Sequence, residues 1–331
     1  MRHAYAQLET PIVDLLFGQT WHLFGWQNVY APASVQAQGL PGQLYSRAPQ
    51  LRVSKSLLYS QIGLEAAVAV VRPQQRDAGI PEFEGGLRVL FPGWTALTTA
   101  RAMTTRIQPL SIAVTGDVRD YVVPEFSALP SATVEKTVSS VALDAFVPVL
   151  PATETQRANA LSLVGEFVVG RGSSDLYTNA TGGMQMPTVA NNTGLNPPPT
   201  YPQNVDNGLV VFDLDGNLHA MQWTTLFVGA QYYLPVLDGR VWVAVNYSHM
   251  ESSNAKDYAR PYVATLPDPQ SSYFVSATQV RDSIDFFDAD VFVDPIDGLR
   301  FGLEAAVYVD HYVDGVRAVN QRVQLGTLWM F

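Results

Sequence analysis

The sequence predicts an all-β protein, a transmembrane antiparallel up-and-down β-barrel, and three features of the chain lead to this prediction. Apolar and polar side chains alternate between residues 298 and 311, so the two faces of that strand meet different surroundings. The alternation outlasts an ordinary strand of about five or six residues and reaches the roughly 9–11 residues that a bilayer-crossing strand needs. Short and long connections also alternate along the chain, as they do in barrels whose strands cross a membrane.

The clearest alternation lies in the last fifty or so residues of the chain. One row of the strand at 298–311 is apolar and the other is mostly polar or small. The apolar row consists of Leu299, Phe301, Leu303, Ala305, Val307 and Val309, and the other row of Arg300, Gly302, Glu304, Ala306, Tyr308 and Asp310. The closing segment repeats the pattern, with Val319, Val323, Leu325, Trp329 and Phe331 on one side. Rows of this kind suit hydrocarbon on one face and water on the other.

Composition excludes several classes of protein. The chain has 331 residues, of which 47% are hydrophobic, and it contains no stretch of 18 uncharged apolar residues, so no transmembrane helix is expected. Cysteine is absent, which rules out a disulfide framework and a thiolate metal site, and no metal or other cofactor is expected. The net charge of −10 argues against nucleic acid as a partner.

Thirteen strands are predicted within a single domain, 1–331, and residues 92–106 fit either a connection or one more weak strand pair. The predicted strands are 3–9, 13–24, 45–57, 64–70, 83–91, 112–119, 140–147, 161–169, 224–234, 240–250, 283–294, 298–311 and 319–331. Bacterial single-chain barrels have even strand numbers, so a signal peptide and one or three further strands are expected before residue 1, for a total of about 14–16.

The connections predict an orientation for the barrel. Short links fall near Pro11, Ser60 and Pro151, whereas long external loops are predicted at about 26–44, 171–217 and 251–281. The segment 171–217 is rich in Gly, Asn and Pro, so no ladder strand is expected there. Short turns belong on the periplasmic side and long loops on the outer side.

Charged side chains in the middle of the predicted strands share the polar rows. An Arg or Lys that faces lipid at the bilayer midplane costs about 2–4 kcal/mol, so these charges should point into the lumen. The predicted pore-lining residues are Arg52, Glu82, Glu84, Arg88, Asp117, Arg119, Asp144, Glu166, Arg240, Asp288, Asp290, Arg300, Glu304 and Arg322. They could screen solutes by charge, or they could only solvate the lumen and neutralise one another across strands.

Two stretches carry a resemblance to a known family. The end of the chain, Gln324-Leu325-Gly326-Thr327-Leu328-Trp329-Met330-Phe331, resembles that of a Gram-negative outer-membrane porin. Arg2-His3-Ala4-Tyr5 followed by Gly18-Gln19-Thr20-Trp21 is similar to a strand pair of the DcaP-like trimeric porins.

The resemblance implies a passive diffusion channel for small hydrophilic solutes and ions in the outer membrane. It implies a homotrimer in contact with the lipid bilayer and lipopolysaccharide, and a terminal signal, Trp329 and Phe331, read by the barrel-assembly machinery. It also implies that one long loop folds into the lumen, with 171–217 and 26–44 as the candidates. The excess of acidic over basic residues, 30 against 20, leans towards a preference for cations.

Two other classes of function stay open at this point. A barrel enzyme of lipase or protease type would need a Ser/His or Asp/His group, and the chain offers only sequence neighbours, Ser248 with His249 and Asp310 with His311. A soluble all-β binding module would bury the apolar rows against a second sheet.

Overall fold

The computed structural model describes residues 3–36, 39–59, 61–75, 78–102, 105–125, 131–153, 156–179, 209–212, 216–258 and 280–330. Among these residues no helix is both long and apolar enough to cross a membrane.

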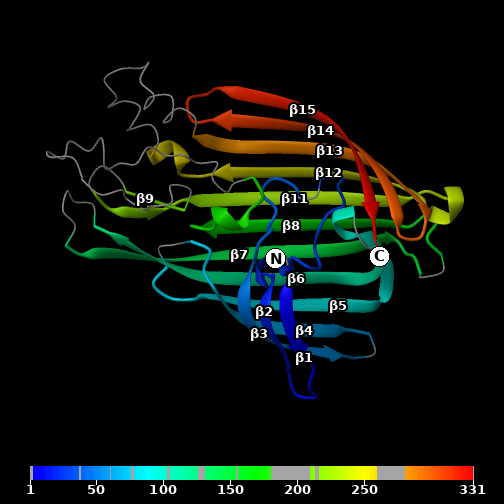
Figure 1. The fold of residues 1–331 in the computed structure, drawn as a ribbon, viewed down its shortest axis with the longest axis horizontal. Coiled ribbons are helices and arrows are strands. Elements are labelled where there is room, and N and C mark those ends of the chain that lie inside the picture. Colours follow the sequence, from blue (N-terminus) through cyan, green and yellow to red (C-terminus); the bar gives the residue numbers. More distant parts are fainter. Residues whose placement is uncertain are drawn as a thin grey trace.

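The described chain forms one large antiparallel sheet in which neighbours in the chain pair as neighbours in space (Figure 1). The order is β1 to β8 and then β11 to β15, which makes 13 strands, as predicted. The strands are β1 (Ala4–Leu8), β2 (Asp14–Trp21), β3 (Arg47–Leu58), β4 (Gly63–Val71), β5 (Glu82–Thr99), β6 (Thr105–Pro124), β7 (Thr133–Leu150), β8 (Leu161–Arg171), β11 (Gln222–Tyr233), β12 (Val241–Ser252), β13 (Arg281–Ile296), β14 (Leu299–Tyr312) and β15 (Arg317–Trp329). β9 (Val210–Phe212) and β10 (Leu218–Ala220) form a separate hairpin, so the prediction of no strand in 171–217 was wrong at residues 210–212.

The sheet carries apolar side chains on its outer face and charged side chains on its inner face, which is the reverse of a soluble protein. Leu303 is 49% exposed, whereas its neighbour Glu304 is fully buried; likewise Leu87 is 57% exposed and Glu84 only 3%. The outward rows therefore present Leu, Val and Phe, and the inward rows carry the charges. A compact soluble fold would bury the apolar rows. This sheet instead fits an apolar medium outside, which argues against the soluble binding module.

The end of the β5–β6 hairpin folds inward. This is the region for which the sequence fits either a connection or one more weak strand pair. The register shifts between Phe91 and Thr95, and Pro92, which has no N–H to donate to a ladder, lies in that shift. Beyond it, the Thr99 amide donates to the Gln231 side chain on β11. Residues 92–99 and 105–106 thus belong to the ends of two long strands, and η2 (Ala100–Ala102) follows the first of them, so the described residues here form no additional strand pair.

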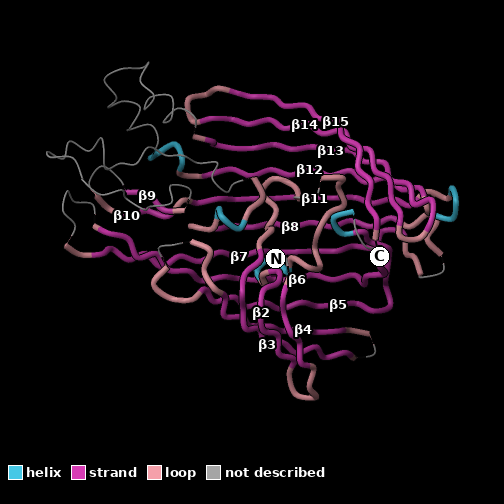
Figure 2. Tube along the Cα trace, viewed as in Figure 1, coloured by secondary structure: helices cyan, strands magenta, loops and turns pink. Residues whose placement is uncertain are grey.

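The link between β2 and β3 lies inside the curved sheet. We call residues 22–46 the inner segment; it contains the short helix η1 (Phe24–Trp26), and most of its described residues are buried. Its polar contacts reach β5, β8 and β13, so the sheet wraps around it. The prediction that 26–44 is an external loop was therefore wrong, whereas the prediction that it is a candidate for a loop inside the lumen agrees with its burial. In Figure 2 loops drawn in pink cross the strands of the sheet in the middle of the view.

The other long link, β8 to β11, packs on the inner segment at one end. Residues 172–179 include η3 (Ser174–Leu176), and the amide of Tyr45 donates to the Leu176 carbonyl at 2.8 Å. The amide of Gly42 donates to the Thr178 carbonyl at 2.9 Å. The middle of the predicted loops 171–217 and 251–281 lies outside the described residues.

Candidate pore and its inner segment

Carboxylates of the inner wall hold the backbone of the inner segment. Glu84 accepts hydrogen bonds from the amides of Leu23 and Phe24, at 2.7 and 3.2 Å. Glu166 accepts one from the Leu44 amide at 2.9 Å. Loops normally lie on the surface because their backbone N–H groups need partners. These carboxylates supply the partners, and so make a buried loop possible.

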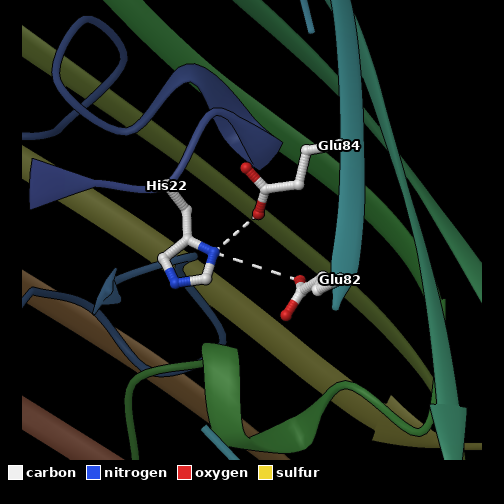
Figure 3. Close-up of side chains that lie close together, drawn as sticks. All are labelled: His22, Glu82 and Glu84. Atoms are coloured by element: carbon white, nitrogen blue, oxygen red, sulfur yellow. Dashed lines mark hydrogen bonds and ion pairs between the residues drawn. The ribbon is translucent and has the colours of Figure 1, made fainter. Parts of the chain in front are cut away.

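His22 begins the inner segment and forms its first anchor (Figure 3). Its Nδ1 lies 2.6 Å from Glu84 Oε1 and 4.0 Å from Glu82 Oε1, and all three side chains are fully buried. Arg119 Nε lies 3.4 Å from the other oxygen of Glu82. Burial disfavours the charged imidazole, but the two carboxylates outweigh it and raise the pKa of His22 above its ordinary value.

Basic groups face the carboxylates of this anchor. Arg119 also binds Asp175 of the β8–β11 link, with Nη1 at 2.6 Å from Oδ1. The His22 imidazole and the Arg119 guanidinium thus lie among the carboxylates of Glu82, Glu84 and Asp175. His22, Glu82 and Glu84 could supply ligand atoms for a metal ion. However, His22 Nδ1 is already hydrogen-bonded to Glu84 Oε1, and Arg119 lies beside Glu82, so we assign the cluster as an ion-paired anchor.

A second anchor joins the middle of the inner segment to β13 and β14. The Val35 amide donates to Asp290 Oδ1 at 3.0 Å, and the Gln36 amide donates to Glu304 Oε2 at 3.0 Å. The Val35 side chain sits over Gly302 and Gly326, where an added Cβ would come within 2.7 Å of it. These two glycines are cross-strand partners, so together they leave the space that Val35 fills.

Arginines also contact the inner segment and the residues next to it. The guanidinium carbons of Arg47 and Arg101 lie 3.4 and 3.9 Å from the centre of the Trp21 ring, which stacks with both cations. Arg101 donates to the Gln27 carbonyl, and Arg106 donates to the Asn28 carbonyl at 3.0 Å. Neither Arg101 nor Arg106 was among the predicted lining residues, because the strand parity of 92–106 was not legible.

A cavity of about 530 Å³ is lined by Trp21 and Asn28, which contact these arginines. Its walls come from β1 to β4 and from the inner segment, and include Trp21, Trp26, Arg52 and Glu65. Arg52 donates to the Trp21 carbonyl at 2.7 Å and to the Gln50 side chain at 3.0 Å, not to a carboxylate. Glu65 is neutralised by Arg88 at 2.5 Å.

The predicted lining residues divide into two groups by exposure. Ten of them are buried: Glu82, Glu84, Asp117, Arg119, Asp144, Glu166, Asp288, Asp290, Arg300 and Glu304. Four are partly exposed: Arg52, Arg88, Arg240 and Arg322. Most of the acidic side chains therefore contact protein rather than open water, and a role in lining a pore stays a prediction for each of the fourteen residues. The acidic residues were found by strand parity; their binding of a loop backbone was missed, because no local pattern marks it.

Two basic residues of the set lie near the short turns. Arg300 makes two bonds to Asp294, at 2.6 and 2.7 Å, and stacks on Trp242. Arg240 lies 3.1 Å from Asp297, which is largely exposed at the β13–β14 turn. Both arginines are thus held at that end of the sheet.

The sequence neighbours considered for catalysis do not assemble into a site. Ser248 is fully buried on the inner face, whereas His249 is on the outer face, where its Nδ1 lies 2.8 Å from Asp285. Asp310 pairs with Arg281 at 2.8 Å. His311 lies 4.0 Å from Asp285. Strand alternation places each pair of neighbours on opposite faces of the sheet.

The terminal signal is described only in part. Trp329 is 64% exposed on the outward face of β15. Phe331 lies outside the described residues. The assembly role of both residues stays a prediction.

Solved structures of outer-membrane channels have the same fold. The outer membrane channel DcaP of Acinetobacter baumannii superposes with a TM-score of 0.64 at 15% identity, covering 96% of this chain and 71% of that one. Pseudomonas putida OprB superposes with a TM-score of 0.55 at 10% identity, covering 99% of this chain and 72% of that one. No protein-family model and no curated protein matches the sequence. At these identities the likeness shows the fold, and the predicted porin-type β-barrel fold is confirmed.

Proposed function

We propose that this chain is an outer-membrane porin of a Gram-negative bacterium, a single-domain barrel through which small hydrophilic solutes and ions diffuse passively. The observation that carries the proposal is the inverted sheet, with apolar rows outside, charges inside and a buried segment crossing the interior. Catalysis is not part of the proposal, since Ser248 and His249 lie on opposite faces. The DcaP channel has the same fold, which supports this reading.

The inner segment is proposed to narrow the passage. Wall carboxylates bind its backbone, and a cavity lies between β1 to β4 and residues Trp26 and Asn28 of the segment, with Arg52, Asp14 and Glu65 in its lining. Solutes would pass through this cavity, because the anchors fill the space beside Glu84 and Asp290. Arg52 lines this cavity, and Arg47, Arg101 and Arg106 contact its lining residues Trp21 and Asn28, so we expect a preference for anions. This is opposite to the preference for cations that the total charge suggested.

Conductance of the purified protein in planar bilayers tests the proposal. Replacing residues 23–44 by a short Gly-Ser linker should raise the unit conductance, because the obstruction is gone. The matched control inserts the same linker into the exposed β14–β15 turn around Gly315, where the conductance should stay unchanged. A folded, reconstituted protein that conducts no ions would refute the channel function, and a deletion variant that conducts like the parent would refute the narrowing.

Reversal potentials across a salt gradient test the ion preference separately. An anion-selective sign is expected for the parent protein. A cation-selective sign would show that the acidic residues dominate the passage, whatever the outcome of the deletion.

The proposed partners follow from the outer face. Exposed leucines and valines need a lipid bilayer around them, with lipopolysaccharide at the long-loop end and neighbouring copies in a trimer. Chemical cross-linking in detergent should give a ladder that ends at three chains. Replacement of Trp329 by Ala should reduce assembly into the outer membrane if the assembly machinery reads this end, and unchanged assembly would argue against that role.

A further inference from the structure

Three carboxylates meet on the inner wall where β13 and β14 run side by side. Asp290 is the cross-strand partner of Glu304, and Asp288 lies two residues from Asp290 on the same face. All three residues are at most 1% exposed. Each offers one carboxylate oxygen, and these oxygens lie within 4.8 Å of one another.

The hydrogen bonds around this cluster leave two buried oxygens without a partner. Glu304 is well satisfied, by Arg322 at 2.7 Å, Ser34 at 2.8 Å and the Gln36 amide. Asp288 Oδ1 accepts from Asn246 at 2.6 Å, and Asp290 Oδ1 accepts from the Val35 amide. The Oδ2 atoms of Asp288 and Asp290 are buried and accept no hydrogen bond from the described residues.

The charge balance differs from that of the His22 anchor. Here three carboxylates share a single cation, Arg322, among the described side chains, which leaves two negative charges uncompensated. Buried carboxylates need paired charge or a metal ion, because desolvation of an unpaired charge is very costly. The missing charge equals that of one divalent cation.

The donor set indicates which cation. Calcium binds oxygen ligands at about 2.3–2.6 Å, so two of its ligand oxygens lie at most about 5 Å apart. The three oxygens of the cluster satisfy that limit, and the cluster contains no nitrogen or sulfur donor that would favour a transition metal. We propose that Asp288, Asp290 and Glu304 bind one divalent hard cation, of the Ca²⁺ type, that fastens the inner segment to the barrel wall.

The position of the site ties the cation to the inner segment. Asp290 and Glu304 are also the residues that accept hydrogen bonds from Val35 and Gln36. A cation that draws the carboxylates together therefore holds the acceptors of the segment in place. Loss of the cation lets the carboxylates repel one another, so this stretch of the segment loosens.

Calcium binding to the whole protein in detergent tests the proposal directly. After treatment with EDTA, equilibrium dialysis against Ca²⁺ should show one tightly bound ion per chain. The variants Asp288→Asn and Asp290→Asn should bind it more than about 100-fold more weakly, because loss of an outer-sphere partner alone costs about 10–100-fold. The matched control, Asp297→Asn in the exposed turn of the same hairpin, should bind like the parent.

Two outcomes would overturn the proposal. The first is a parent protein that binds no Ca²⁺ at about 1 mM, the weak end of the range for protein sites; shared protons would then neutralise the cluster. The second is an Asp288→Asn variant that binds Ca²⁺ with the parent's affinity and that shows the same difference in gel mobility between heated and unheated samples as the parent. The parent measurement requires no variant to fold. Because the readout is bound Ca²⁺, it is also independent of whether the barrel conducts.

Discussion

Replacement of Glu84 by Gln tests the idea that wall carboxylates hold the inner segment. Glu84 accepts two backbone amides and lies 2.6 Å from the Nδ1 atom of His22. A hydrogen bond to a charged group is worth about 1.5–3 kcal/mol, and breaking a buried ion pair costs about 3–5 kcal/mol. The Gln oxygen can keep part of the amide bonding while the charge is lost. We expect the free energy of unfolding to fall by about 3 kcal/mol.

The assay combines unfolding of the detergent-solubilised protein with single-channel recording. Glu84→Gln should lower the unfolding midpoint and increase current fluctuations, since the beginning of the inner segment is released. The control is Asp297→Asn, which removes a carboxylate from the exposed β13–β14 turn. The side chains of Arg240 and Asp297 in that pair are 36% and 90% exposed, so we expect a loss below about 1 kcal/mol. Equal losses in the free energy of unfolding would refute the reasoning, since breaking the buried anchor would then cost no more than breaking an exposed ion pair.

Three further predictions concern the outer face, the passage and the first anchor. Leu303→Arg should destabilise the protein in a bilayer by about 2–4 kcal/mol, whereas Ile12→Arg in an exposed turn should cost less than about 0.5 kcal/mol; equal unfolding midpoints in vesicles would contradict a lipid-facing row. Arg52→Gln and Arg101→Gln should each lower the anion-to-cation permeability ratio by roughly fivefold, since a charge at 4 Å contributes about 1 kcal/mol in water, and an unchanged reversal potential would remove them from the passage. The pKa of His22 is raised in the folded protein. The stability that its pairing with Glu84 contributes is therefore fully present below pH 6.5 and is lost as the pH rises through the folded-state pKa. Unfolding measured against pH should show this loss in the parent but not in His22→Gln, and the same profile in both would contradict it.

The described strands and their faces could be predicted because both are local properties. A side chain's face in a strand follows from its parity, and each strand pairs with its neighbour in the chain. The outward face of Leu303 and the inward face of Glu304 could therefore be predicted from the sequence alone. Parity failed where the ladder is irregular, at the register shift between Phe91 and Thr95, and at residues 22–24, which were predicted as strand but lie in the inner segment.

The chain by itself thus determined an inverted, outward-apolar sheet with alternating short and long connections. Only the tertiary structure decided which link enters the interior and which charges it meets. Ser34 and Glu304 are 270 residues apart in the chain, and no local pattern couples them. The physical reason is that a buried loop is stable only where its amides find acceptors, and those acceptors are brought together from distant strands by the curvature of the sheet.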